Sequence, residues 1–219
     1  MKHIQKLLER EISLTFKNSN SLISYASFFF IALILFIFAI GPDAGILSSL
    51  FRPILWMIMI FALISISETF VYEDYFDGSL QELQFLGYSE MSIFLSKCLA
   101  MTISLLIPNL ILIPISSILF NVENFFLLET IFLIILAFPT LSLISILSAL
   151  ISLQVKKNKF IQFILIMPFF IPIVIFSTGT NFLLNIGNEF KILILISLFL
   201  ITLPLCIFLG RLVIKEINH

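Results

Sequence analysis

Only a few side chains in this sequence have the chemical types that catalysis or metal binding needs. The two histidines, His3 and His219, stand at opposite ends of the chain and offer no ligand cluster for a metal or a haem iron. None of the seven glycines is followed by lysine, so the phosphate-binding loop G-x-x-x-x-G-K-S/T is absent and the chain cannot hydrolyse ATP through that motif. The sequence therefore predicts a non-catalytic chain with no metal site and no cofactor of its own.

The sulfur-containing side chains lie in apolar stretches, where packing explains them better than chemistry. Cys98 and Cys206 have no partner spacing, and we interpret them as small buried hydrophobic residues. Several methionines could in principle ligate iron, but among phenylalanines and isoleucines their flexible thioethers are expected to fill gaps. These are Met57, Met59, Met101 and Met167.

Three charged residues lie in or at the edge of long apolar stretches. An ionisable side chain inside a membrane is a candidate functional residue by default. Glu68 and Lys97 flank the same polar loop, so we interpret them as a structural ion pair, with snorkelling to the interface as the alternative. Glu129 lies near the end of its stretch and is expected to be solvated.

The polar interval at residues 72–92, together with the residues from Glu68 that precede it, is rich in acidic side chains. Between Glu68 and Glu90 there is no lysine or arginine. A solvated face is one explanation, and a docking surface for the basic groove of a partner is the other. The acidic residues are Glu68, Glu73, Asp74, Asp77, Glu82 and Glu90.

A short helix is predicted within this interval. Ser79 and Glu82 have the S-x-x-E spacing of a capping box, and Gly87 can adopt the left-handed conformation that ends a helix. Leu80 and Leu83 share one face, with Leu86 close to it. Because two helical turns are marginal in water, the segment needs its own membrane helices or a second protein to lie on.

The composition indicates the kind of fold that holds these residues in place. The chain has 219 residues, of which 60% are hydrophobic and 11% charged, and its mean hydropathy is +1.18. Such values are typical of a polytopic membrane protein. A net charge of -1 does not suggest nucleic acid as a partner. The interval 72–92 is too short for a soluble domain, so residues 1–219 are expected to form one all-α transmembrane domain.

Six apolar stretches are long enough to cross a bilayer. The first has about 19 residues, or ~29 Å at ~1.5 Å per residue. The predicted spans are 22–40, 53–71, 93–120, 125–153, 160–178 and 192–212. Residues 1–20 place Ile4, Leu7, Leu8, Ile12 and Phe16 at helical spacing, which predicts a helix in the membrane interface; the alternative is a polar lead into the first span.

Prolines interrupt four of the spans and are expected to kink or break them, because proline removes a backbone donor. The predicted kink positions are Pro108, Pro114, Pro139, Pro168 and Pro172, with Pro204 in the last span. Neighbouring helices can cover such irregularities.

The basic residues predict the orientation. Of the 12 lysines and arginines, only Arg52 and Lys191 fall on one side, which leaves 12 - 2 = 10 on the other. An excess of lysine and arginine marks the cytoplasmic side. Both termini and the interval 72–92 are therefore expected in the cytoplasm. A polar turn at 179–188 is expected on the opposite side.

This arrangement resembles the type II ABC exporter permeases, and the sequence is identified as a member of the haem exporter protein B family, CcmB. The block Asp77-Gly78-Ser79-Leu80 is the most specific match. Gly41-Pro42-Asp43, Ser96-Lys97 and the order of the prolines agree with it. One departure is that the family often has basic residues shortly after Glu68, where this chain has Thr69 and Tyr72.

The resemblance implies a permease subunit, in two copies, of a cytochrome c maturation complex in the bacterial inner membrane, or alternatively the mitochondrial one. It implies an ATPase partner (CcmA), haem-handling subunits (CcmC, CcmD) and the chaperone CcmE, with ATP on the partner and haem handled by the complex. ATP use would release haem-loaded chaperone. The short helix would be the coupling helix, carried by Asp77, Gly78, Ser79, Leu80, Glu82 and Leu83. The alternatives are an exporter of another small or lipid-like substrate and a non-transducing scaffold.

Overall fold

The computed structural model describes residues 2–17, 20–155, 159–178 and 188–216, and all regular structure within these ranges is helical. This confirms the predicted all-α class. The helices are α1 (Lys2–Lys17), α2 (Asn20–Ile40), α3 (Ala44–Ser67), α4 (Thr69–Phe76), α5 (Ser79–Phe85), α6 (Glu90–Leu119), α7 (Asn124–Gln154), α8 (Lys159–Thr178) and α9 (Asn188–Glu216). The predicted turn at 179–188 and the basic residues Lys156 and Lys157 lie mostly or wholly outside the described residues.

Six segments are long and apolar enough to cross a membrane, as predicted. They are Asn20–Ile40, Ala44–Phe76, Glu90–Leu119, Leu127–Gln154, Phe160–Thr178 and Glu189–Glu216. Each overlaps one predicted span. The second is much longer than the predicted 53–71, because α4 continues α3 beyond Glu68 and because α3 begins well before Pro53.

The start of α3 is set by Asp43 rather than by Pro53. The Asp43 carboxylate accepts hydrogen bonds from the backbone N–H groups of Gly45 (2.9 Å) and Ile46 (3.1 Å). This is an N-cap, which satisfies donors that the first turn of a helix leaves unpaired. Gly41 makes the preceding turn with φ of 89°, so the second span begins directly after the first.

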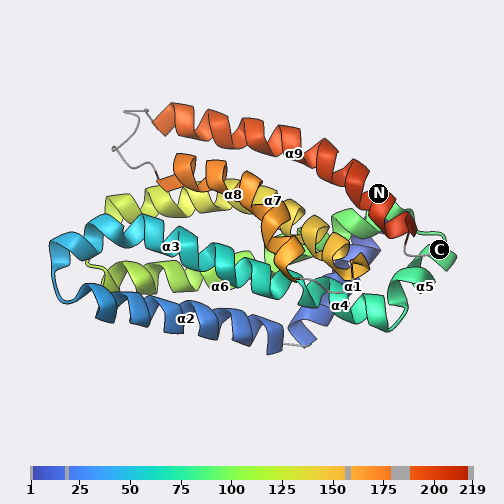
Figure 1. The fold of residues 1–219 in the computed structure, drawn as a ribbon, viewed down its shortest axis with the longest axis horizontal. Helices are drawn as coiled ribbons and strands as arrows, with labels where there is room; N and C mark the ends of the chain where they lie inside the picture. The colour runs from blue at the N-terminus through green and yellow to red at the C-terminus, as the bar shows by residue number, and fades with distance from the viewer. Residues whose placement is uncertain (1, 18–19, 156–158, 179–187, 217–219) are drawn as a thin grey trace.

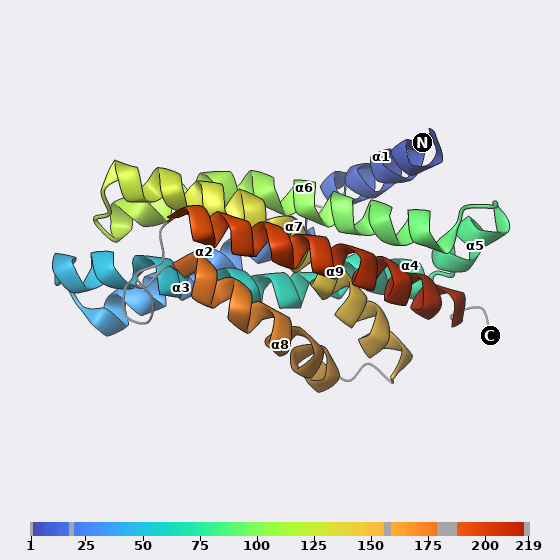
Figure 2. The ribbon, with the colours of Figure 1, turned by 90° about the horizontal axis from the view of Figure 1, so that it is seen from above.

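The helices form an elongated bundle (Figure 1). α1, α5 and the last turns of α9 gather at one end, and the turns that join α2 to α3 and α6 to α7 lie at the other end (Figures 1 and 2). An even number of spans requires the chain to enter the first span and to leave the last span on the same side. The arrangement agrees with that requirement, while the side of the membrane remains a prediction.

α3 and α7 form the centre of the bundle. Buried residues make up 67% of the α3–α4 span and 72% of the α7 span, against 17% for α2 and for α9. α7 contributes small residues to this centre, and Thr102 of α6 lies 2.6 Å from Ser142 of α7 between their hydroxyl oxygens. Small and hydroxyl side chains at helix contacts are usual in membranes, where they allow close packing.

The prolines lie inside continuous helices. Pro108 and Pro114 are within α6, Pro139 is within α7, and α8 contains both Pro168 and Pro172. The alternative that Pro108 and Pro114 divide their span into two helices is therefore wrong. Proline is tolerated inside membrane-spanning helices because neighbouring helices, hydroxyl side chains and local adjustments of the backbone satisfy the freed groups.

One buried polar bond joins α2 to the bundle. The Tyr25 hydroxyl donates to Asn109 Oδ1 of α6 over 2.8 Å, and both residues are almost fully buried. A hydrogen bond between transmembrane helices contributes about 0.6 kcal/mol on average. It links α2, whose buried residues are Tyr25, Phe29 and Leu33, to α6.

We predict that α9 depends on the absence of a side chain at Gly210. A Cβ atom there would lie 2.5 Å from Cδ2 of Phe94 on α6, so Gly210→Ala should lower the free energy of unfolding by about 1–3 kcal/mol through overpacking. Thermal unfolding in detergent measures this. Adding Phe94→Leu should restore part of the loss, and a Gly210→Ala variant as stable as the parent would contradict the close contact.

Candidate functional site

The short helix α5 begins at a glycine turn and not at a capping box. Gly78 is the N-cap residue with φ of 75°, and no side chain caps the helix. The N–H groups of Gln81 and Glu82 donate to the Gly78 carbonyl over 3.0 and 3.1 Å. The prediction that Ser79 caps the helix with Glu82 is therefore wrong by one residue: the left-handed turn at Gly78 already sets the start, and Ser79 lies inside the first turn.

The predicted end of α5 at Gly87 is confirmed. Gly87 has φ of 84°. Its N–H donates to the Gln84 carbonyl (2.9 Å), and the Tyr88 N–H donates to the Leu83 carbonyl (3.1 Å). This pair of bonds is the Schellman motif, which requires a left-handed residue such as glycine.

α5 has a buried face and an exposed face. Leu80 and Leu83 are 1% and 6% exposed, as their spacing predicts, whereas Phe85 and Leu86 are 88% and 74% exposed. The prediction that Leu86 lies near the apolar face is wrong, because Leu86 is the C-cap residue and the chain reverses at Gly87. The structure thus places Phe85 and Leu86 on the surface.

The exposed surface of α5 also carries acidic residues. Asp77 and Glu82 are both exposed, and together with Phe85 and Leu86 they form what we call the α5 tip. Contiguous exposed apolar side chains with a charged rim are typical of protein interaction surfaces.

α5 is attached to the end of α9 by a side-chain bond. Gln84 Nε2 donates to the carbonyl of Ile214 over 3.1 Å. In the same turn, Gln154 Nε2 of α7 donates to the carbonyl of Val213 over 2.8 Å. The last turn of α9 has carbonyl groups with no intrahelical partner, and these amides satisfy two acceptors near that end.

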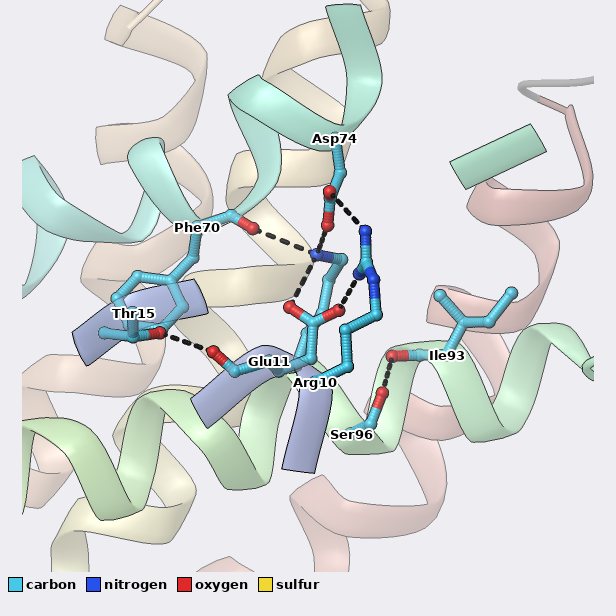
Figure 3. A network of polar contacts seen from close by, with 8 residues as sticks. Arg10, Glu11, Thr15, Phe70, Asp74, Ile93 and Ser96 are labelled. Atoms are coloured by element: carbon cyan, nitrogen blue, oxygen red, sulfur yellow. Dashed lines mark hydrogen bonds and ion pairs between the residues drawn. The ribbon is translucent and has the colours of Figure 1, made fainter. Parts of the chain in front are cut away.

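A buried charge network connects three helices beside α5. Arg10 and Glu11 of α1 face Asp74 of α4, as Figure 3 shows, and Lys97 of α6 lies among them. Lys97 Nζ lies 3.1 Å from Glu11 Oε2 and is also paired with Asp74. Arg10 bonds Glu11 over 2.6 Å and Asp74 over 3.1 Å. We call these four residues the charge network.

The network is balanced and fully bonded at its centre. Lys97 is 0% exposed, and its ammonium group donates to Glu11, Asp74 and the Phe70 carbonyl (3.1 Å). An ammonium group has three donors, so all three are used. Burial acts to lower the pKa of Arg10, but its bonds to Asp74 and Glu11 raise that pKa overall. Two positive groups therefore face two negative ones.

The carboxylate partners of Lys97 differ from the predicted one. Glu68 was expected to pair with Lys97, but Glu11 and Asp74 occupy that position. Glu68 is the residue between α3 and α4, six residues before Asp74. Six residues turn a helix by about 600°, so the two side chains point to different faces and Asp74 shares the face of Phe70.

Glu11 and Arg10 were missed at the sequence level. The sequence predicts an apolar face of α1 that includes Phe16, yet Phe16 is 46% exposed and the buried residues are Leu7, Glu11 and Thr15. These three recur every four residues, which is the spacing of one helix face. Glu11 follows Leu7 by four residues and therefore shares its helix face. This spacing was the feature of the sequence that could have identified Glu11 as a buried acid.

A second charged cluster lies at the opposite end of the bundle. Arg52 of α3 pairs with Glu129 of α7 and donates to Thr130 Oγ1 over 3.1 Å, while Lys191 of α9 lies 3.8 Å from Glu129. The prediction that Glu129 is simply solvated is wrong, because three helices meet around it. Within the described ranges, no three His, Cys, Asp or Glu side chains group to hold a metal.

Comparisons with known proteins agree with the resemblance found in the sequence. A family model described as CcmB protein matches residues 2–213. A relative named heme exporter protein B from Haemophilus influenzae is 25% identical over 174 residues, which cover 80% of this chain and 79% of the relative. The protein of that name from Pseudomonas aeruginosa is 25% identical over 79% of this chain and 78% of its own length. An uncharacterized protein from Rickettsia conorii is 30% identical over 97% of this chain and 96% of its own length.

We predict that Lys97→Met destabilises the chain strongly, because Glu11 and Asp74 keep only Arg10 as a counter-charge. Removing one partner of a buried ion pair costs about 3–5 kcal/mol. Chemical or thermal unfolding in detergent measures the loss.

Two further variants test whether the lost counter-charge causes the loss of stability. Lys97→Met combined with Glu11→Gln and Asp74→Asn should recover part of the stability, since the buried negative charges are gone. Arg211→Met is the matched control, because Arg211 is 65% exposed in its side chain and lies 3.9 Å from Glu90; its effect should stay below about 1 kcal/mol. Equal losses for Lys97→Met and Arg211→Met would contradict a buried network.

Proposed function

Because the chain belongs to the CcmB family, we propose that it is the membrane-spanning permease subunit of an ABC-type haem-export complex. Relatives that match about four fifths of the chain carry the name heme exporter protein B. In this role the chain has no catalytic residues, and ATP is bound and hydrolysed by a separate ATPase subunit. The absence of a phosphate-binding loop from the sequence supports that division of labour.

The α5 tip is the observation that carries the coupling role. Phe85 and Leu86 project from one end of the bundle while Leu80 and Leu83 hold α5 from beneath. A large aromatic side chain at the centre of a small exposed patch is the usual anchor of a protein interface. Asp77 and Glu82 add negative charge that would guide a basic groove of the ATPase subunit.

Two structural links would carry a displacement of α5 into the membrane. Gln84 ties α5 to the last turn of α9. The preceding helix α4 contributes Asp74 to the charge network, which fastens it to α1 and α6. A push on α5 would therefore reach α9 directly and α6 through α4.

The family membership also supports a wider proposal about the complex. Two copies of this chain would assemble with a CcmA-like ATPase, with CcmC-like and CcmD-like haem-handling subunits, and with a CcmE-like chaperone in cytochrome c maturation. Haem would be handled by the complex, and ATP use would release the haem-loaded chaperone. The membrane would be the bacterial inner membrane, with α1, α5 and the end of α9 on its cytoplasmic side.

We predict that Phe85→Ser weakens binding of the ATPase subunit by at least about tenfold, the loss expected for an interface anchor. Phe190→Ser is the matched control, because Phe190 is 64% exposed on the far end of α9. Co-purification with a titrated ATPase subunit measures binding, and cytochrome c formation in cells measures function. The substitution is made at an exposed residue because a change at a buried one, such as Leu83→Pro, would unfold α5 itself.

The contribution of the negative charge of the α5 tip can be tested in the same binding assay. Glu82→Lys should weaken ATPase binding most at low ionic strength, since salt screens exposed charges. If Phe85→Ser and Glu82→Lys both bind the ATPase subunit and form cytochrome c like the parent, the chain is a scaffold and the coupling proposal is wrong.

Single introduced cysteines test the predicted orientation of the chain in the membrane. Gln5→Cys on α1 and Ser48→Cys on α3 both replace exposed residues, at opposite ends of the bundle. Both native cysteines, Cys98 and Cys206, are buried, so their background should be low. A membrane-impermeant maleimide applied to whole spheroplasts should label only Ser48→Cys; labelling of Gln5→Cys alone would reverse the orientation.

A further inference from the structure

The second membrane-spanning segment is interrupted at Glu68, where α3 ends and α4 begins. In a regular helix the Glu68 N–H would donate to the Ile64 carbonyl, four residues earlier. Here it donates to the Ile66 carbonyl instead. Thr69 Oγ1 donates to the same Ile66 carbonyl over 2.7 Å. The backbone hydrogen bonds therefore change partners at this position.

Side chains occupy the Ile64 carbonyl in place of the Glu68 N–H. The Ser67 hydroxyl donates to it over 2.9 Å, and Gln162 Nε2 of α8 donates to it over 3.3 Å. A backbone carbonyl oxygen has two lone pairs. These two side chains use both, so the oxygen has no lone pair left for the Glu68 N–H. We call Ile64, Ser67, Glu68 and Gln162 the α3–α4 junction.

Gln162 is the member of the junction that comes from another helix. α8 packs against α3, and Gln162 is buried. Its amide group has two N–H donors, which go to the Ile64 carbonyl and, over 2.8 Å, to Ser67 Oγ. A polar group buried among apolar helices is costly unless it is paired. Gln162 is therefore held at the junction by both of its donors.

The junction has two arrangements that exclude each other. In the observed one, Gln162 and Ser67 hold the Ile64 carbonyl and the helix is interrupted. In the other, Gln162 withdraws, the Glu68 N–H donates to Ile64, and α3 continues into α4 as one helix. A side chain inserted between the backbone groups of a helix is a known cause of kinks. Exchange between the two arrangements would therefore change the direction of α4 relative to α3.

We infer that the α3–α4 junction is a conformational switch, in which Gln162 of α8 sets the direction of α4. α4 leads from the membrane toward α5 (Figure 1) and carries Asp74 of the charge network. A movement of α8 would thus reach the α5 tip through one backbone carbonyl. The consequence for ATPase coupling rests on the proposed function, whereas the switch is a property of the chain itself and is tested without an ATPase subunit.

The test measures distances between pairs of spin labels on the full chain in nanodiscs. One label replaces the exposed Asp77 directly after α4, and the second replaces either Ile31 on α2 or Leu200 on α9, both also exposed. These two helices lie on opposite sides of the bundle in Figure 1. Asp77 lies about 13 Å beyond Glu68 at ~1.5 Å per residue, so a change in helix direction of about 20° would move it by about 5 Å.

Gln162→Leu removes the amide and should shift at least one of the two mean distances by about 3–5 Å. Ser67→Ala removes the second donor to Ile64, so it should shift the same distance in the same direction. Gln154→Leu is the matched control, because Gln154 also donates to a backbone carbonyl, that of Val213. It should leave both distances unchanged.

Size-exclusion profiles check that each variant is folded, and Ser67→Ala, which removes a single oxygen atom, provides the test if Gln162→Leu does not fold. Parent distances in both variants would overturn the switch. An equal shift in Gln154→Leu would also overturn it, since that result would indicate a general loosening of the bundle. A shift confined to the junction variants supports the switch even if the α5-tip variants bind the ATPase subunit like the parent, because then only the coupling proposal is wrong.

Discussion

The buried ammonium group of Lys97 is the constraint on which this end of the molecule depends. A charge at 0% exposure is tolerable only if its partners are close and all of its donors are used. Glu11, Asp74 and the Phe70 carbonyl meet that condition from two other helices. Lys97 thereby joins α1 and α4 to α6. Arg10 balances the second carboxylate and makes the network neutral.

This anchoring explains how a helix as short as α5 stays folded, which the proposed coupling role requires. Seven residues are too few for a stable isolated helix. Gly78 and Gly87 fix its two ends by backbone geometry, Leu80 and Leu83 hold it to the bundle, and Gln84 ties it to α9. Because both of its ends are fixed and one face is buried, its exposed tip can contact a partner without the helix unfolding.

The large features of the fold were predictable because they depend on long runs of similar residues. Six apolar stretches, the acidic interval 72–92 and the end of α5 at Gly87 all follow from local composition or from a single backbone requirement. Boundaries were less predictable where two local signals competed. α3 begins at Asp43 and not at Pro53 because the Asp43 carboxylate caps its first turn. α5 begins at Gly78 and not at Ser79 because glycine adopts the left-handed conformation of the turn that precedes the helix.

The sequence by itself determined that this chain spans a membrane six times, lacks an ATP-hydrolysis motif and carries a short helix with an acidic approach. Only the tertiary structure decided which charges meet. Glu11 and Lys97 are 86 residues apart, and Arg52 and Glu129 are 77 apart. No local pattern encodes such pairs, because the choice between Glu68, Asp74 and Glu11 depends on how each helix is rotated and packed. That rotation is set jointly by all the neighbours of a helix, so it appears only when the bundle is assembled.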